Sequence, residues 1–214
     1  MASFDIAQKY VAIKEGVYNS STKDNGNYNS GKAGVGELVG TKYGVAAFTL
    51  SAWLGRPATK SDMMNLSYET ALKIFKKNYW DAIGGDKLKN QSIATLLYDG
   101  AINQGVGAMQ GIVATALGMK VSIPFQQTVI DAINSLKKAK EEEIFNKIGE
   151  LRIARYNATG YGSKPFIDRV KGIAFSTTEL AKKNPITTIA IAVLGTSIIL
   201  GLIFRKKIIS KLNF

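Results

Sequence analysis

The sequence contains no cysteine and no histidine among its 214 residues. Without cysteine the chain forms no disulfide and has no thiol nucleophile, and the redox state of its compartment is left undetermined. Without histidine it has no Ser-His-Asp triad, and it lacks the usual ligands of a zinc site. If the chain is an enzyme, carboxylates are the most plausible proton carriers, because Lys and Tyr titrate at high pH unless strongly perturbed.

Acidic residues are also few, since 16 Asp and Glu stand against 28 Lys and Arg, and the formal net charge is +12. This excess favours acidic polymers or anionic surfaces as partners, including nucleic acid, peptidoglycan and membrane headgroups. The sequence has no zinc-finger spacing, no RNP-like aromatic motif and no long basic run outside its C-terminus. We therefore expect no nucleic-acid partner.

One long segment lacks charge altogether, residues 185–204 with the sequence PITTIAIAVLGTSIILGLIF. As a helix its 20 residues would span about 30 Å, the thickness of a membrane hydrocarbon core. A buried core helix is the alternative, but basic residues flank the segment at 182–183 and 205–207. The sequence predicts a single transmembrane helix at 185–204 with membrane lipid as a partner, after a linker at 177–184 and before a basic tail at 205–214.

The direction of this membrane span is left open, because the positive-inside rule compares the two flanks and both are basic. The N-terminal stretch MASFDIAQKYVAIKEG has no basic start followed by a clean apolar run. We therefore expect no secretory signal peptide.

The sequence of residues 1–176 predicts a mainly α body with a small β-hairpin or loop insert. Ser3 can cap a first helix, and Gly16 suits the left-handed position after its end. Residues 17–44 are rich in Gly, Asn, Ser and Thr, which predicts a β-hairpin or an ordered loop. A helix with Ser67 as its N-cap is expected to carry an apolar stripe of Tyr68, Ala71, Leu72, Phe75 and Tyr79. Further helices are expected over residues 91–103, 109–117 and 126–157, the last as two helices or one long one.

Several short motifs follow one another along residues 4–175. Glu15-Gly16-Val17-Tyr18-Asn19 precedes Asp24-Asn25-Gly26 and Thr41-Lys42-Tyr43-Gly44-Val45, and then come ALKIFKKNYWDAI (71–83), IATLLYDGAINQG (93–105), RIARYNA (152–158) and PFIDRVKGI (165–173). This order resembles the glycoside hydrolase family 108 muramidases, lysozyme-like enzymes of phages and bacteria with the approximate signature E-G-G-Y-x-N and then T-x-[YF]-G-[IV]. The resemblance implies a catalytic part at about 1–100 and peptidoglycan-binding-like helices at about 101–176. We expect no metal and no other cofactor.

Glu15 is the candidate general acid, since glycosidic hydrolysis needs a carboxyl group that gives a proton to the leaving oxygen. A carboxyl at a helix C-terminus lies beside the negative end of the helix dipole, and Tyr10, Tyr18 and apolar neighbours would desolvate it. Both effects would raise the pKa of Glu15, as an acid catalyst requires. The residues alone also allow a solvated last residue of the helix, and the resemblance favours catalysis.

A second carboxylate would act as base or nucleophile, and its distance from the first would indicate inversion or retention. Asp24 and Glu37 are the candidates in the polar insert. Asp24 is preferred because it matches the Asp/Gly-rich stretch of the family, although Asp-Asn-Gly also suits a turn. Thr41 matches the threonine before the Tyr-Gly pair and is expected to position a water or the second carboxylate.

Tyr18, Asn19 and Tyr43 are the candidate substrate-binding residues, because aromatic faces and amides suit pyranose rings. Either aromatic residue could equally belong to the core. Asp99 and Asn103, four residues apart on one helix face, are expected to form a buried hydrogen-bonded pair that supports the cleft.

The sequence thus predicts a membrane-anchored N-acetylmuramidase that cleaves peptidoglycan between N-acetylmuramic acid and N-acetylglucosamine. A phage or prophage origin is expected, either as an endolysin or as a virion entry enzyme, in a virion membrane or the host inner membrane. The rival hypothesis is a non-catalytic wall-binding or structural membrane protein of a virion. Val17, in place of the second glycine of E-G-G, is its best support. A holin-like pore former is disfavoured, because one span carries a large folded body.

Overall fold

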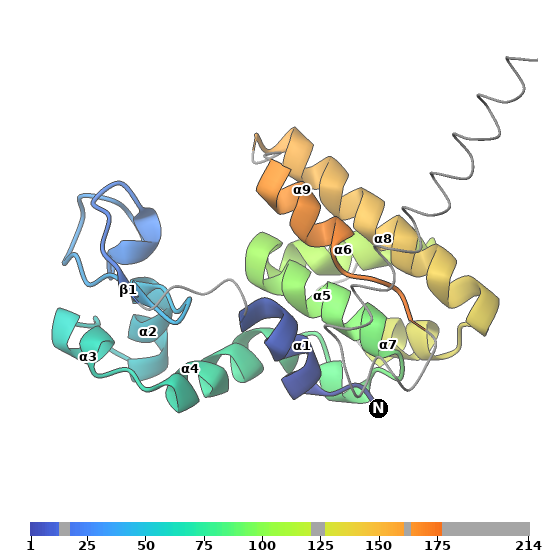
Figure 1. Cartoon of the computed structure of the whole chain (residues 1–214), viewed down its shortest axis with the longest axis horizontal. Coiled ribbons are helices and arrows are strands. Elements are labelled where there is room, and N and C mark those ends of the chain that lie inside the picture. The colour runs from blue at the N-terminus through green and yellow to red at the C-terminus, as the bar shows by residue number, and fades with distance from the viewer. Residues whose placement is uncertain (13–17, 121–126, 161–163, 177–214) are drawn as a thin grey trace, which may run out of the picture. The chain divides into compact units, whose positions relative to one another are not determined.

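The computed structural model describes residues 1–12, 18–120, 127–160 and 164–176. In these ranges the chain is mainly helical with one small two-stranded sheet, which confirms the expected mainly α body with a small β insert (Figure 1). The chain divides into two compact units. The loop unit is Val11–Ala82, and the helical unit combines Met1–Tyr10 with the described residues from Ile83 onward.

The sheet of the loop unit pairs β1 (Tyr18–Asn19) with β2 (Thr41–Lys42) in antiparallel direction. The chain between these strands makes a long loop that contains one turn of 3-10 helix, η1 (Asn25–Asn27). The hairpin and ordered loop expected from the turn-forming residues are therefore confirmed within residues 18–44.

Four helical segments complete the loop unit: α2 (Ala47–Leu54), α3 (Lys60–Met64), α4 (Tyr68–Phe75) and the π-helical turn η2 (Lys76–Trp80). Helix α4 begins where the sequence predicts, because the Ser67 hydroxyl accepts the Thr70 N–H at 3.1 Å. The expectation that Tyr68 lies on the buried stripe is wrong, since Tyr68 is 48% exposed. Ile74, which the stripe omitted, is fully buried.

The helical unit contains the first seven residues of α1 (Phe4–Ala12) and the elements that follow the loop unit. These are η3 (Gly85–Lys87), α5 (Gln91–Gln104), α6 (Val106–Leu117), α7 (Gln127–Asn134), α8 (Lys138–Ala158) and α9 (Lys164–Lys171). The segment expected at 126–157 thus forms two helices. Helices α5, α6 and α8 pack against one another, α7 packs on α6, and α9 packs on α8.

Helix α5 is the centre of the helical unit, since every residue of Gln91–Ala101 is buried. Its N-terminus is capped by Asn90, whose side chain accepts the Ile93 N–H at 3.0 Å. A Cβ at Gly100 would collide with the Met109 sulfur, so the absence of a side chain there lets α6 approach α5 closely. Helix α5 continues through residue 100 without a break, so the structure has no boundary there. The expected division into a catalytic part at about 1–100 and peptidoglycan-binding-like helices at about 101–176 remains a prediction.

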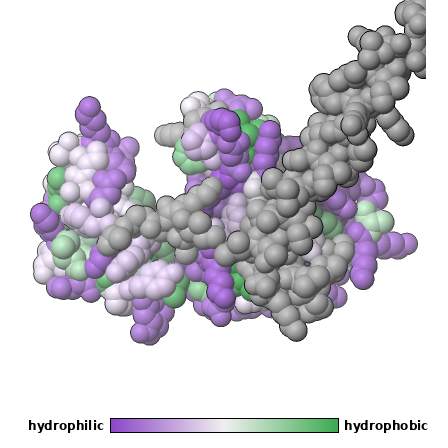
Figure 2. Space-filling model, viewed as in Figure 1, coloured by the Kyte–Doolittle hydropathy of each residue, from purple (hydrophilic) through white to green (hydrophobic). Residues whose placement is uncertain are grey.

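No helix in the described ranges is both long enough and apolar enough to cross a membrane. The transmembrane helix expected at 185–204 lies outside those ranges, as do the linker at 177–184 and the basic tail at 205–214. On the face in Figure 2, hydrophilic residues cover much of the coloured surface and hydrophobic ones form scattered patches. Apolar side chains instead fill the interior of each unit, as in other folded domains.

Candidate active site

Glu15, the candidate acid, lies outside the described residues together with its neighbours Gly16 and Val17. Along the chain it precedes β1 by three residues. The described part of the candidate site is therefore the hairpin and the loop that β1 and β2 enclose.

The hairpin register brings two of the predicted site residues together, because Asn19 is the pairing partner of Thr41. Directly opposed residues of an antiparallel pair have their Cβ atoms about 5 Å apart on the same face of the sheet. The side chains of Asn19 and Thr41 therefore share one face, and Tyr18 shares the other face with Lys42. Thr41 is partly buried, whereas Asn19 is exposed.

Tyr18 holds the end of the loop by packing as well as by a hydrogen bond. Its hydroxyl donates to the Val39 carbonyl oxygen at 3.2 Å. Gly40 has a φ of +89°, and a Cβ there would lie 2.6 Å from Cε2 of Tyr18 and 2.8 Å from the Asn19 carbonyl oxygen. Glycine is required at position 40, and one side of the Tyr18 ring is committed to that contact.

Asn27 ties the loop together and was missed by the sequence analysis. It is fully buried, and its carbonyl oxygen accepts the N–H groups of Val39 and Gly40 at 2.8 and 2.9 Å. Its side-chain Nδ2 donates to the Ser21 carbonyl oxygen at 3.0 Å, while its Oδ1 has no hydrogen-bond partner among the described residues. An asparagine between two glycine-rich stretches looks like any turn residue, so only its burial reveals this role.

Asp24 lies in a turn, where its Oδ1 accepts the Gly26 N–H at 2.8 Å and caps η1. Asp24 is exposed. The alternative turn function considered for Asp-Asn-Gly is therefore present, and a catalytic function of Asp24 remains a prediction. Among the described residues, only one of its carboxylate oxygens accepts a hydrogen bond.

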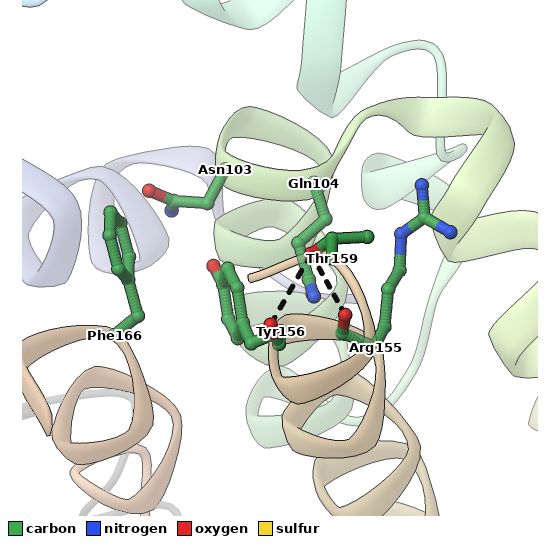
Figure 3. A pocket seen from close by; sticks show the side chains of 6 residues that line it. All are labelled: Asn103, Gln104, Arg155, Tyr156, Thr159 and Phe166. Carbon is green, nitrogen blue, oxygen red and sulfur yellow. Dashed lines mark hydrogen bonds between the residues drawn. The ribbon is translucent and has the colours of Figure 1, made fainter. Parts of the chain in front are cut away.

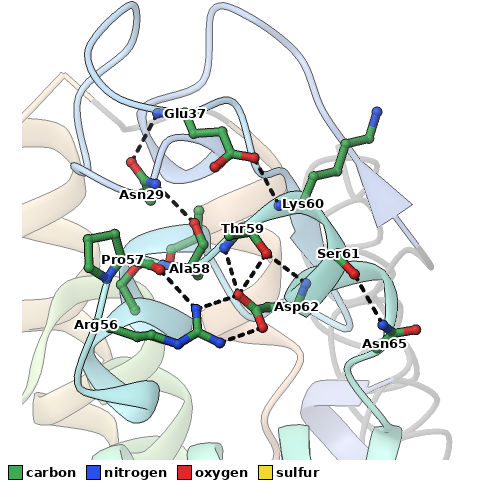
Figure 4. Close-up of polar contacts among 12 residues, drawn as sticks. Asn29, Glu37, Arg56, Pro57, Ala58, Thr59, Lys60, Ser61, Asp62 and Asn65 are labelled. Carbon is green, nitrogen blue, oxygen red and sulfur yellow. Dashed lines mark hydrogen bonds and ion pairs between the residues drawn. The ribbon is translucent and has the colours of Figure 1, made fainter.

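Glu37 is tied to a different anchor, the N-terminus of α3. Its Oε1 accepts the Lys60 N–H at 3.1 Å, and its own N–H donates to Asn29 Oδ1 at 3.1 Å (Figure 4). Asn29 in turn donates to the Ala58 carbonyl oxygen at 2.9 Å. These bonds fasten the tip of the loop to the connection between α2 and α3.

A bidentate ion pair stabilises that connection. Two Arg56 nitrogens donate to Asp62 at 2.7 and 2.8 Å, and the N–H and hydroxyl of Thr59 both donate to Asp62 Oδ2 at 2.8 Å (Figure 4). The Arg56 hydrogen bonds, followed by those of Thr59, hold the pKa of Asp62 well below its usual range. Asp62 is thus an ionised structural carboxylate and not a candidate acid.

Tyr43 has a left-handed backbone with a φ of +52°, and Gly44 follows with a φ of +73°. Positive φ at both central residues is the signature of a two-residue hairpin turn, here closed by reciprocal hydrogen bonds between Lys42 and Val45. The turn presents Tyr43 edge-on to Tyr68, with ring centroids 5.4 Å apart, and the Lys42 ammonium lies 5.1 Å from the Tyr43 ring. Tyr43 and Tyr68 form a partly exposed aromatic patch, and Lys42 lies beside it. The sequence analysis did not predict that Tyr68 lies at the surface.

Comparison with known families identifies this segment. Residues 8–105 match the sequence model of glycosyl hydrolase 108. This segment is similar to glycosyl hydrolase 108 domains, and the chain is therefore a glycoside hydrolase. Every residue predicted for its active site lies inside the matched range.

Among solved structures, the structure of Brucella abortus SagA is similar to this chain with a TM-score of 0.66 and 25% sequence identity. The similarity covers 83% of this chain and 97% of that one. No curated protein matches the sequence.

The matched segment includes Asp99 and Asn103, and the pair expected between them is confirmed. Nδ2 of Asn103 donates to Asp99 Oδ1 at 3.3 Å and to the Asp99 carbonyl oxygen at 2.7 Å. The stronger partners were missed, since Arg152 Nη2 and Arg169 Nε lie 2.7 and 2.5 Å from the two carboxylate oxygens. Asp99 is completely buried between these arginines, which makes it a structural carboxylate.

Both arginines lie beyond the residues that match the glycosyl hydrolase 108 family, on α8 and α9. The C-terminal helices therefore supply charges that a buried aspartate of the matched segment needs. Within the described ranges, no three acidic side chains are grouped closely enough to hold a metal ion.

Proposed function

We propose that this glycoside hydrolase cleaves peptidoglycan between N-acetylmuramic acid and N-acetylglucosamine, with Glu15 as the general acid. The observation that carries this proposal is the match of residues 8–105 to glycosyl hydrolase 108, with Glu15-Gly16-Val17-Tyr18-Asn19 near the start of the match. Along the chain Glu15 precedes β1 by three residues. A protonated carboxyl there would give its proton to the leaving sugar oxygen.

We assign the second carboxylate to Asp24, with Glu37 as the alternative. Each of them uses one oxygen to accept a backbone N–H and leaves the other oxygen without a hydrogen bond among the described residues. Asp24→Asn and Glu37→Gln would keep an acceptor in place and remove only the charge. We expect a loss of activity of about 100-fold or more from Asp24→Asn and a small effect from Glu37→Gln. The reverse result would transfer the assignment to Glu37.

The exposed groups beside the hairpin suit a glycan substrate. Asn19 uses its Oδ1 to accept the Ser21 N–H at 2.8 Å, which leaves its Nδ2 available to donate to a sugar hydroxyl. The aromatic patch of Tyr43 and Tyr68 offers ring surface on which a pyranose can stack. Thr41, opposite Asn19, would orient a water or the second carboxylate.

The identity of the new chain end tests this proposal. Purified peptidoglycan is digested with the full chain, the reducing ends are reduced with borohydride, and the sugar alcohols are identified by mass spectrometry. A muramidase produces muramitol. Glucosaminitol would assign the other glycosidic bond, and an absence of new reducing ends would favour the non-catalytic wall-binding alternative.

We further propose that residues 185–204 anchor the enzyme in a membrane. The support is in the sequence, 20 residues without charge between basic flanks. Leu194→Arg in the full chain should reduce the fraction that resists alkaline carbonate extraction, because an arginine near the middle of a span costs about 2.5–3.5 kcal/mol on insertion scales. Leu212→Arg, in the basic tail, is the matched control. Equal extraction of wild type and Leu194→Arg would contradict the proposal that residues 185–204 anchor the protein in a membrane.

The anchor and the activity together support a function in a virion membrane or the host inner membrane, as part of a phage or prophage. The net charge of +12 would help to hold the enzyme near acidic wall polymer or anionic lipid. Immunoblots of purified virions and of fractionated infected cells distinguish an entry enzyme from an endolysin. Absence of the protein from both virions and membrane fractions would contradict this localisation.

A further inference from the structure

The helical unit has a pocket of about 270 Å³ that the proposed chemistry does not use. It is lined by Asn103 and Gln104 at the end of α5, by Arg155 and Tyr156 on α8, by Thr159 directly after α8, and by Phe166 on α9 (Figure 3). The rings of Tyr156 and Phe166 are stacked with centroids 5.2 Å apart. The volume lies below the 300–1,000 Å³ that is typical of sites for drug-sized ligands, so it suits the end of a chain.

Positive charge is in excess beneath this pocket. Asp99 is the only acidic side chain that pairs with Arg152 and Arg169 in the described part of the chain, and it can neutralise only one of them. Arg152 is almost fully satisfied, because it also donates to Gln104 Oε1 at 2.9 Å and to the Leu96 carbonyl oxygen at 3.1 Å. The remaining charge is carried mainly by Arg169.

Two hydrogen-bonding groups in this cluster are buried without a well-formed hydrogen bond among the described residues, Arg169 Nη2 and the Tyr156 hydroxyl, which lies beside Arg152. Buried polar groups in folded proteins are nearly always paired, so an orphaned donor on a guanidinium calls for a missing acceptor. Burial raises the pKa of Tyr156, so its hydroxyl stays protonated and can donate.

One of these two groups lies at the pocket, since Tyr156 lines it directly. Arg169 is not a lining residue, but its Nε donates to Asp99 Oδ1, the same oxygen that accepts from Nδ2 of the lining residue Asn103. Arg155 adds a third cation at the pocket wall, and its guanidinium has no ion-pair partner in the described ranges.

We propose that this pocket binds a carboxylate group of a peptide, and that the peptide is the stem peptide of peptidoglycan. The carboxylate oxygens would accept from the Tyr156 hydroxyl and from the Arg155 guanidinium, and the Phe166 ring would cover the apolar part of the terminal residue. The excess positive charge of the neighbouring buried arginines would favour an anionic ligand. The choice of stem peptide rests on the proposed function, because the polymer that the enzyme would cleave carries peptides with free carboxylates.

An open groove continues from the pocket and gives the rest of such a ligand a path. It lies between α6 and α8, has a volume of about 490 Å³ and shares Arg155 and Thr159 with the pocket. Gly107 and Gly111 line it, and a Cβ at either position would meet no atom within 4 Å. Helix packing therefore does not require glycine at these positions, and the small residues leave the groove wide.

The test measures binding of a fluorescent disaccharide-tetrapeptide to the full chain by anisotropy. The same muropeptide with its carboxylates amidated, and the disaccharide without peptide, are measured in parallel. Because charge-assisted hydrogen bonds are stronger than neutral ones, we expect amidation to weaken binding at least tenfold and the disaccharide to bind more weakly still. Equal affinity for free and amidated muropeptide, or equal affinity for the disaccharide alone, would overturn the proposal.

Variants locate the binding site. Arg155→Gln and Tyr156→Phe should each weaken binding of the free muropeptide about fivefold or more, and they should have much less effect on the amidated one. Lys147→Gln removes a charge from an exposed position of the same helix and should leave binding unchanged. If Arg155→Gln and Tyr156→Phe both bind like Lys147→Gln, the pocket is not the site.

Binding and hydrolysis are measured separately, so the two proposals can be contradicted separately. If the protein digests peptidoglycan but shows no preference for the free carboxylate, the proposed function stands and the pocket proposal is wrong. If it shows this preference and digests nothing, the pocket proposal stands and the muramidase activity is wrong.

Discussion

Replacing Asp99 with asparagine removes one negative charge from the interior of the helical unit and changes little else. Asn has nearly the shape of Asp, so the packing of α5 against α8 is retained. The substitution leaves Arg152 and Arg169 buried side by side with no carboxylate between them. Arg152 has no exposed surface, and Arg169 is only 9% exposed, so water cannot replace the lost partner.

Removing one partner of a buried ion pair costs about 3–5 kcal/mol, because the other charge stays desolvated. For a domain of this size, each kcal/mol lowers the midpoint of thermal unfolding by about 2–4 °C, so we expect a decrease of roughly 6–20 °C. Arg169→Gln should cost less, since one of its nitrogens has no partner and Asp99 keeps Arg152.

Far-UV circular dichroism during heating measures both changes in the full chain. Asp168→Asn is the matched control, because it breaks an exposed ion pair between neighbours on α9, and we expect it to change stability by less than about 1 kcal/mol. If Asp99→Asn unfolds at the temperature of Asp168→Asn, the buried cluster does not hold the helical unit together. If Arg169→Gln lowers the free energy of unfolding as much as Asp99→Asn does, the inference that the cluster carries an excess positive charge is wrong.

Three further outcomes follow from the contacts of single residues. Gly40→Ala forces a side chain against the Tyr18 ring at a backbone φ of +89°. It should lower the free energy of unfolding, measured by urea titration, by about 1–3 kcal/mol. An unchanged midpoint of unfolding would contradict the close approach of Tyr18 to residue 40. Burial, followed by the charge of Asp99, raises the pKa of Tyr10 to about 12 from 10, so its contribution to stability is complete below pH 10 and is lost as the pH rises toward 12. Tyr10→Phe should therefore weaken the loss of stability between pH 10 and 12, and an identical pH profile would contradict this burial. Tyr68→Ala removes half of the exposed aromatic patch and should raise KM for soluble glycan fragments several-fold with little change in kcat, whereas an unchanged KM would exclude the patch from substrate binding.

Local signals in the sequence predicted local structure well. Ser67 correctly predicts the start of α4, and the many Gly, Asn and Ser residues correctly predict the hairpin. Both signals are local, because helix caps and turns depend on residues close together in the sequence. Helices α2 and α3 were missed because they lack a periodic apolar pattern, and the capping box of Thr59 and Asp62 was the local signal that could have revealed α3. The apolar residues of α2 point in most directions, with Phe48 and Trp53 exposed, and α3 has only five residues, so neither has a clear helical period.

Contacts between distant parts of the chain carried no such signal. Asp99 pairs with arginines 53 and 70 residues away, and the neighbouring Asn103 was the only partner that helical spacing could reveal. The contact of Tyr68 with Tyr43 depends on the turn that carries Tyr43, which periodicity along α4 does not encode. The candidate site was found from the order of its motifs, and the structure adds how Asn19 and Thr41 are paired and how Asp24 and Glu37 are anchored.

The most direct test of the central claim compares the release of soluble muropeptides from purified peptidoglycan by wild type, Glu15→Gln and Glu150→Gln. Glu150 is exposed on α8 and serves as the matched control. Glu15→Gln cannot donate the proton and should lose at least about 100-fold in rate, while Glu150→Gln keeps the wild-type rate. Wild-type release by Glu15→Gln would contradict its function as the general acid.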